Sequence, residues 1–239
     1  MKLLLLSSSR AQNSAYMAPN LAWIAQHLQG INNVLFIPFA DVSGNYDGYV
    51  EKVQQSLASL PLKVTGLHQF SCAKTAITEA QAVMVGGGNT FALLHKLYQL
   101  DLLTTLRQRV CSGLPYIGWS AGANIAGASI STTNDMPIIE PPSFRALHCL
   151  NLQLNPHYTD FVPTDFHGET RDMRLAEFMT LQPKMPIIGL PEGTALRCID
   201  KQITVLGAAG AFWFLAGQKT SLTGNTLLPE DYQALLASS

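Results

Sequence analysis

The chain alternates short apolar runs with helical segments, and this alternation restricts its fold more than any other feature. Five strand–helix units follow one another in the first half. The predicted strands cover residues 3–9, 34–40, 62–70, 82–88 and 115–120, and the predicted helices cover 18–30, 49–60, 72–80, 91–110 and 121–128. Apolar runs separated by helices are typical of parallel strands that are buried on both faces. The sequence therefore predicts an α/β fold, a mostly parallel sheet with helices on both faces.

The second half is less regular. A Pro-rich loop over 134–144 is followed by a predicted strand in 147–156, a helix over 168–181, a strand over 185–193 and strands with Gly turns over 194–222. Strands joined by short Gly turns are typical of antiparallel pairing, which predicts a mixed or antiparallel C-terminal part. Because no repeat or low-complexity linker interrupts the chain, we expect one α/β domain over 1–239.

Composition narrows the classes of partner. Hydrophobic residues make up 47% of the chain, charged residues 13%, and the net charge is -1. Without a basic or acidic run, the chain has no electrostatic preference for nucleic acid or anionic membranes, so we expect small-molecule partners. The apolar start "MKLLLL" is too short for a signal peptide, and no run is long enough to span a membrane. Four dispersed cysteines form no CxxC pair, which favours a reducing, cytoplasmic location and predicts no metal site.

A serine motif stands at the end of the fifth predicted strand. Gly118-Trp119-Ser120-Ala121-Gly122 matches G-x-S-x-G, the nucleophile elbow, in which a tight strand-to-helix turn exposes the serine hydroxyl. Ligands of α/β sheets bind beyond the carboxyl ends of the strands, where this serine lies. The alternative is a Gly-rich turn with an ordinary N-cap serine.

A second Gly-rich segment ends the preceding strand. Gly86–Gly88 lead into Asn89 at the start of a helix, so several backbone N–H groups can converge on one point. The N–H groups of Gly88 and Ala121 are therefore candidates for an oxyanion hole. A dinucleotide-binding loop is disfavoured, because Phe91 stands where its fingerprint requires glycine.

A serine nucleophile needs a base and an acid that orients the base. Of six histidines, His157 follows a predicted strand and belongs to a loop at the same edge as Ser120 if that strand is parallel. The alternative is a turn histidine bonded to backbone. Two acids remain open as its partner: Glu192, at another strand end, and Asp135, in the loop beyond the elbow helix.

Six blocks of the sequence together resemble the peptidase E (α-aspartyl dipeptidase) family. They are "VGGGNTF" (85–91), "YIGWSAGANIA" (116–126), "TTNDMPI" (132–138), "NPHYT" (155–159), "GETRDMR" (168–174) and "IGLPEG" (188–193). The resemblance implies a serine peptidase with a fold related to class I glutamine amidotransferases, which cleaves dipeptides with an N-terminal aspartate. It extends over nearly the whole chain.

Carried over to this chain, the resemblance implies Ser120 as the nucleophile, His157 as the base and Glu192 as the orienting acid, with Asp135 as an acidic partner. No cofactor or metal is implied. For the aspartate side chain we expect a cation, and Arg171 can bind a carboxylate through two N–H groups. Arg171 and Asn89 are the predicted substrate-binding residues, although an arginine on a charged helix face is often merely solvated.

Two other functions stay open at this level. A hydrolase similar to cyanophycinase would share the elbow and the Gly-rich loop but cut an aspartyl polymer. A non-catalytic protein on the same scaffold would bind acidic small molecules without turnover. A class I amidotransferase is disfavoured, because its elbow nucleophile is cysteine.

Overall fold

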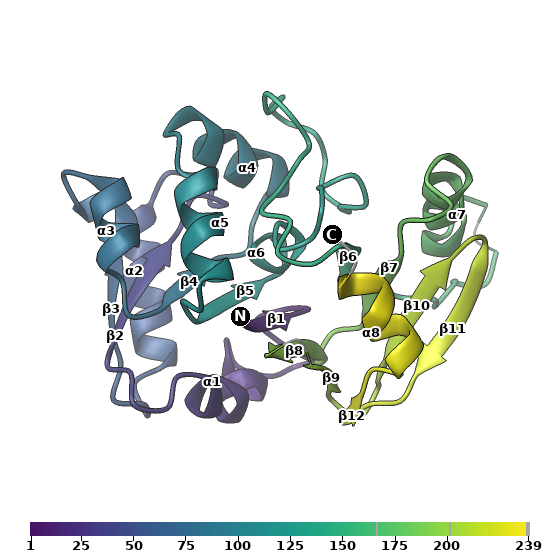
Figure 1. Ribbon diagram of the computed structural model, residues 1–239, viewed down its shortest axis with the longest axis horizontal. Coiled ribbons are helices and arrows are strands. Elements are labelled where there is room, and N and C mark those ends of the chain that lie inside the picture. The colour runs from purple at the N-terminus through teal and green to yellow at the C-terminus, as the bar shows by residue number, and fades with distance from the viewer. Residues whose placement is uncertain (166, 201, 238–239) are drawn as a thin grey trace.

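The computed structural model describes residues 1–165, 167–200 and 202–237, and its strands form two sheets (Figure 1). In the described part, the larger sheet has the order β12-β9-β8-β1-β5-β4-β2-β3. Its parallel strands are β1 (Lys2–Leu6), β2 (Asn33–Ile37), β3 (Lys63–Gly66), β4 (Val83–Val85) and β5 (Tyr116–Trp119). The antiparallel strands β8 (Ala195–Ile199), β9 (Gln202–Leu206) and β12 (Thr226–Leu227) extend it beyond β1.

The second sheet has the order β11-β10-β7-β6. It contains β6 (Gln153–Pro156), β7 (Ile187–Leu190), β10 (Ala211–Leu215) and β11 (Gln218–Leu222). Among the described strands of this second sheet, β6 pairs with β7 in parallel, and the other two pairs are antiparallel. The prediction of a mostly parallel sheet with an antiparallel C-terminal part is confirmed, and the division into two sheets was not predicted. The prediction of one domain over 1–239 stays a prediction.

Helices cover both faces of the larger sheet because its strands are apolar on both. Leu3 and Leu5 of β1 pack in a cluster with α3 (Ala73–Glu79), α4 (Thr90–Gln99), α5 (Leu103–Cys111) and α6 (Ala121–Asn124). Leu4 and Leu6 pack on the other face with α1 (Leu21–His27) and α2 (Tyr46–Ser56). Successive strand residues point to opposite faces, so the run of four leucines supplies both.

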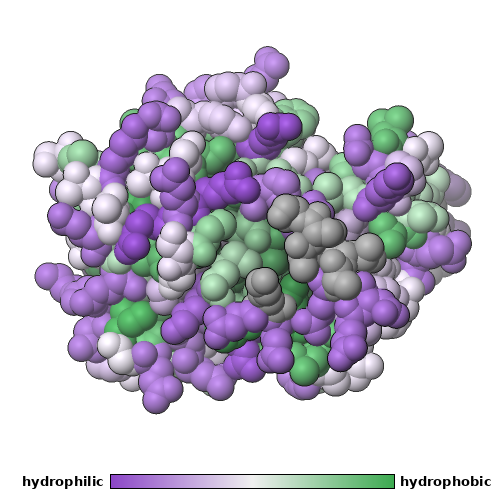
Figure 2. Space-filling view, in the orientation of Figure 1, coloured by the Kyte–Doolittle hydropathy of each residue, from purple (hydrophilic) through white to green (hydrophobic). Residues whose placement is uncertain are grey.

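The other helices are smaller or lie at one end of the molecule. Among the described residues, two 3₁₀ helices span Ala18–Asn20 and Leu67–Gln69. Helix α7 (Arg171–Leu181) packs beside β10 and β11 at one end of the molecule (Figure 1), and α8 spans Glu230–Ala237. Polar residues cover most of the face shown in Figure 2, around a central apolar area. No helix in the described residues is long and apolar enough to cross a membrane.

Three predicted elements differ from the structure. The strand predicted over 62–70 ends at Gly66, and Leu67–Gln69 form a 3₁₀ helix instead. The helix predicted over 91–110 is two helices, because Asp101 adopts a left-handed conformation (φ 51°) that ends the first of them. In the strand predicted within 147–156, only Gln153–Pro156 pairs with a neighbour. The residues before it bond instead to the segment after the elbow helix, as in the hydrogen bond from the N–H of Leu147 to the carbonyl of Ile125.

Candidate active site

The serine motif forms a strained turn between β5 and α6. Ser120 has φ 52° and ψ -114°, a conformation that residues with a Cβ atom rarely adopt. A Cβ atom on Gly118 would lie 2.2 Å from the carbonyl oxygen of Gly122, and one on Gly122 would lie 2.1 Å from that of Val85. The turn therefore requires glycine two positions before and two positions after the serine, which explains why small residues occur here.

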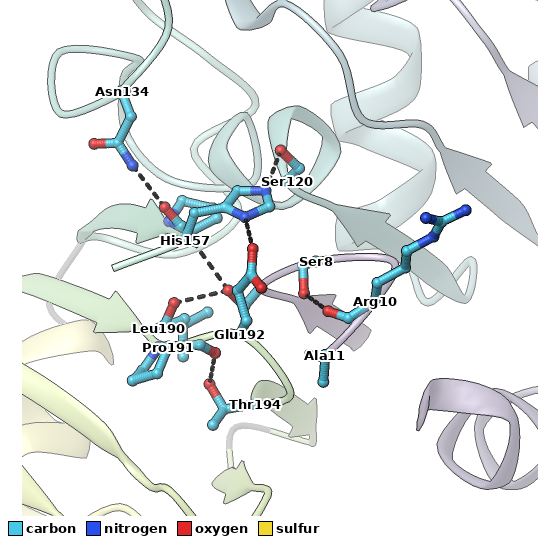
Figure 3. Close-up of polar contacts among 12 residues, drawn as sticks. Ser8, Arg10, Ala11, Ser120, Asn134, His157, Leu190, Pro191, Glu192 and Thr194 are labelled. Atoms are coloured by element: carbon cyan, nitrogen blue, oxygen red, sulfur yellow. Dashed lines mark hydrogen bonds and ion pairs between the residues drawn. The ribbon is translucent and has the colours of Figure 1, made fainter. Parts of the chain in front are cut away.

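His157 lies between Ser120 and Glu192 (Figure 3). Its Nε2 atom is 2.9 Å from the Ser120 hydroxyl, and its Nδ1 atom is 2.8 Å from a Glu192 carboxylate oxygen. The parallel pairing of β6 with β7 brings about this contact, because Pro156 is in register with Leu190. The residues that follow the two strands then lie side by side. The His157 and Glu192 side chains are 42% and 52% exposed, so the pair is open to solvent.

Ser7 joins the two sheets beneath this triad of side chains. This fully buried residue follows β1 of the larger sheet. Its hydroxyl accepts a hydrogen bond from the N–H of His157 at 3.0 Å and donates one to the carbonyl of Leu190 at 2.7 Å. Sequence reasoning missed Ser7, and the only signal was a serine directly after the first apolar run. A hydroxyl both donates and accepts, so it can bridge an N–H and a carbonyl.

The carboxylate of Asp135 bonds to the start of α4 and not to His157. It accepts hydrogen bonds from the N–H and the hydroxyl of Thr90, at 2.7 and 2.5 Å. Of the two acids that the sequence left open, Glu192 therefore contacts the imidazole, and Asp135 contacts the start of α4. Asp135 still lines a narrow recess together with Ser120 and His157.

The Gly-rich loop after β4 lies beside Ser120. A Cβ atom on Gly87 would be 3.0 Å from the Ser120 Cβ atom, which measures how closely the loop approaches. Gly88 lines the same cavity as Ser120. Ala121 is the first residue of α6, where a backbone N–H has no acceptor within the helix. Both predicted oxyanion donors thus belong to segments next to the serine.

The two predicted substrate-binding residues have structural partners. Arg171, the half-buried first residue of α7, donates a hydrogen bond to the side-chain oxygen of Asn134. Burial lowers the pKa of its guanidinium, although arginine stays charged in proteins. Asn134, which the sequence did not single out, lines the recess beside Ser120. Asn89 caps α4 by accepting from the N–H of Ala92 and donates to the carbonyl of Met136.

Two spaces meet at the reacting atoms. A cavity of about 530 Å³ extends from Ser120 toward α2, and the recess of about 20 Å³ extends toward Asn134 and Asp135. Ser120 and His157 line both spaces. The reacting atoms therefore lie between a cavity large enough for an amino-acid residue and a recess with room for about one water molecule. The described residues include no group of three or more histidine, cysteine or acidic side chains that could hold a metal ion.

Known proteins match this chain over most of its length. The model of "Peptidase family S51" matches residues 3–206. A protein named peptidase E from Shewanella amazonensis (strain ATCC BAA-1098 / SB2B) is 47% identical over 228 residues, which are 95% of this chain and 97% of that protein. A second peptidase E, from Shewanella sp. (strain W3-18-1), is 46% identical over 92% of this chain and 93% of its own.

Solved structures share the fold. The crystal structure of a peptidase from an acI-B1 Actinobacterium aligns with a TM-score of 0.66 and 17% identity, over 95% of this chain and 96% of that chain. A candidate peptidase E from Listeria monocytogenes EGD-e aligns with a TM-score of 0.63 and 24% identity, over 86% and 98%. Together with the two relatives of nearly equal length, the family match shows that the chain belongs to peptidase family S51 and is a serine-type dipeptidase similar to peptidase E.

Proposed function

We propose that this protein hydrolyses dipeptides with an N-terminal aspartate, Asp-X, through an ester between the aspartyl group and Ser120. The observation that carries the proposal is the position of His157, with one ring nitrogen at the Ser120 hydroxyl and the other at Glu192. A serine hydroxyl is too weak an acid to attack a peptide bond unaided, and this arrangement supplies the base that it needs.

The proposed reaction runs in two halves. Nε2 of His157 takes the hydroxyl proton as Ser120 attacks the scissile carbonyl, and Glu192 stabilises the resulting imidazolium. The N–H groups of Gly88 and Ala121 donate to the oxyanion. His157 then protonates the leaving amine, and water cleaves the ester by the same route in reverse. The resident groups suffice for each proton transfer.

Charges around the recess support selectivity for aspartate. A substrate β-carboxylate would replace Asn134 as the partner of the Arg171 guanidinium, which can bind both of its oxygens. Both hydrogen bonds from Thr90 to Asp135 end on Oδ2. Within the described part of the chain, this leaves Oδ1 to accept from the substrate ammonium. We assign Asn89 a supporting role at the wall of the larger cavity.

The physiological setting forms part of the same proposal. We expect the substrates to be small peptides in the cytoplasm, because the thiols of Cys72, Cys111 and Cys149 form no disulfide, as in a reducing compartment.

A panel of dipeptides tests the proposal. We expect kcat/KM for Asp-Leu to exceed that for Asn-Leu and Leu-Leu by at least about 10²-fold, since an unpaired charge or an unmet donor in the site costs several kcal/mol. Ser120→Ala serves as the control and should cleave none of them. Faster cleavage of an aspartyl polymer than of Asp-Leu would contradict the dipeptide assignment. Binding of Asp-Leu without turnover, and without labelling of Ser120 by a fluorophosphonate, would indicate a binding protein.

A further inference from the structure

The larger cavity reaches from the reacting residues to a lysine on α2. Lys52 lines it together with Ser120 and His157, and Tyr16 and Tyr49 line it as well. Apart from His157, Lys52 is the basic residue among the side chains that line this cavity. Nothing in the proposed chemistry at Ser120 uses it.

Aromatic side chains hold Lys52 at the cavity. Its Nζ atom lies 4.3 Å from the centre of the Tyr16 ring, within the range of a cation–π contact. The Tyr16 hydroxyl is 3.4 Å from that of Tyr49, and Tyr49 donates to the carbonyl of Gly87 at 3.0 Å. These contacts connect Lys52 with the Gly-rich loop beside Ser120. Burial raises the pKa of both tyrosines, so their hydroxyls stay neutral.

The positive charge of the Lys52 ammonium is not neutralised by a described ion pair. Within the described residues, none of the ion pairs includes it. The acid of the same cavity, Asp41, is turned to Ser43, because its carboxylate accepts from the N–H and the hydroxyl of that residue at 3.1 and 2.8 Å. An anionic group that enters the cavity would therefore meet a lysine whose charge no described carboxylate neutralises.

We propose that Lys52 binds the free carboxylate of the leaving residue and so makes the enzyme prefer dipeptides to longer or amidated peptides. This inference rests on the proposed hydrolysis of Asp-X. Asn134 and Asp135 line the recess, and Arg171 donates to Asn134 from behind it, so we assign the aspartyl part of the substrate to that side. The leaving residue then occupies the larger cavity. In a dipeptide its carboxylate is only two bonds from the leaving nitrogen, whereas in a longer peptide an amide stands there.

The size of the effect follows from the exposure of Lys52. The residue is exposed, so solvent and salt weaken its attraction for a carboxylate. We therefore expect Lys52 to contribute about 10-fold to kcat/KM for Asp-Leu, mostly through KM, and the contribution should shrink as ionic strength rises.

Three substrates separate this role from others. We compare Asp-Leu, Asp-leucinamide and Asp-Leu-Gly in the native protein, Lys52→Met and Lys52→Arg. The control is Lys63→Met, which removes an exposed lysine of β3. Lys52→Met should lower kcat/KM about 10-fold for Asp-Leu and less than about 2-fold for the other two. Lys52→Arg should retain most of the preference, and Lys63→Met should resemble the native protein.

Other results would overturn the inference. If Lys52→Met lowers kcat/KM equally for all three substrates, Lys52 acts on the aspartyl part or on the shape of the cavity. If the substitution leaves kcat/KM unchanged for all three substrates, the carboxylate is bound elsewhere. A native protein that cleaves none of them refutes the proposed function instead. Calorimetry then still tests Lys52 without turnover: in Ser120→Ala, the additional change Lys52→Met should weaken binding of Asp-Leu and not of Asp-leucinamide, and equal weakening would refute the inference.

Discussion

Asp135 and Thr90 are joined by two hydrogen bonds, one from the N–H of Thr90 at 2.7 Å and one from its hydroxyl at 2.5 Å. Thr90 is the first residue of α4, and a carboxylate at a helix N-terminus is stabilised by the helix dipole. The Thr133 hydroxyl also donates to that of Thr90, at 3.0 Å. The loop that carries Asp135 is thus anchored to α4, at the wall of the recess beside Ser120.

This anchoring predicts a structural effect of Asp135→Asn. The loss of charge-assisted hydrogen bonds should lower the free energy of unfolding by about 1–2 kcal/mol. Activity should change mainly through KM, because the imidazole keeps its contacts. Thermal unfolding and steady-state kinetics with Asp-Leu measure the two effects. A fall of kcat by more than about 10³-fold at unchanged KM would instead make Asp135 part of the proton transfer.

Glu192 variants test the acid that contacts His157. Because Glu192 is half exposed, a glutamine there can turn its amide oxygen toward Nδ1 and keep the imidazole orientation. Glu192→Gln then loses only the negative charge, and we expect kcat to fall about 10²-fold. Glu192→Ala also loses the group that orients the imidazole, so its kcat should fall further, by about 10⁴-fold. Equal activity of both variants and the native protein would exclude Glu192 from the mechanism.

Ser120→Ala separates activity from stability. The hydroxyl of Ser120 contacts His157 and makes no side-chain cap to α6, so its removal leaves the turn intact. We expect hydrolysis of Asp-Leu to fall by at least about 10⁴-fold, with a melting temperature within a few degrees of the native value. Ser120→Thr is a useful companion, because a β-branched residue fits poorly at φ 52° and should lower stability as well. Retained turnover in the alanine variant would identify another nucleophile.

Arg171→Met tests the cation for the aspartyl side chain. We expect kcat/KM for Asp-Leu to fall about 10²-fold, since the half-buried guanidinium is only partly screened, while slow cleavage of Asn-Leu should hardly change. The matched control is Arg174→Met, on the same helix, whose guanidinium is exposed and pairs with Glu169 at 3.6 Å. If kcat/KM fell equally for both substrates, Arg171 would maintain the position of Asn134 and would not bind the aspartate side chain.

His27 predicts a loss of stability in acid. Its imidazole is buried at the end of α1. Burial, helped by the positive charge of Lys2, lowers the pKa of His27 from 6.5 to about 4. The unfolded chain therefore binds a proton that the folded protein does not, so stability falls as the pH falls from about 6.5 to about 4. His27 alone should account for about 3 kcal/mol over this window.

Denaturant titrations across that window measure this loss. In His27→Leu the pH dependence should be smaller by about that amount, because leucine does not titrate. If both proteins lose stability in parallel, the acid sensitivity resides in other groups.

The sequence by itself determined the features that are local. Runs such as Leu3–Leu6 predict strands that are buried on both faces, and the structure buries alternate leucines against helices on each side. The elbow was predictable because Gly118 and Gly122 are required by backbone contacts within one turn and with the adjacent strand. The six blocks that resemble peptidase E were sufficient to predict the family, which the matches confirm.

Only the tertiary structure decided which distant groups meet. The choice between Glu192 and Asp135 depends on the register of β6 against β7, and Ser7 bridges the two sheets from a strand about 150 positions away in sequence. The contact of Lys52 with the Ser120 cavity likewise comes from the packing of α2 on the sheet. Hydrophobic periodicity specifies which face of an element is buried but not which element lies against it, because burial is nondirectional and strand register is set by pairing between distant segments.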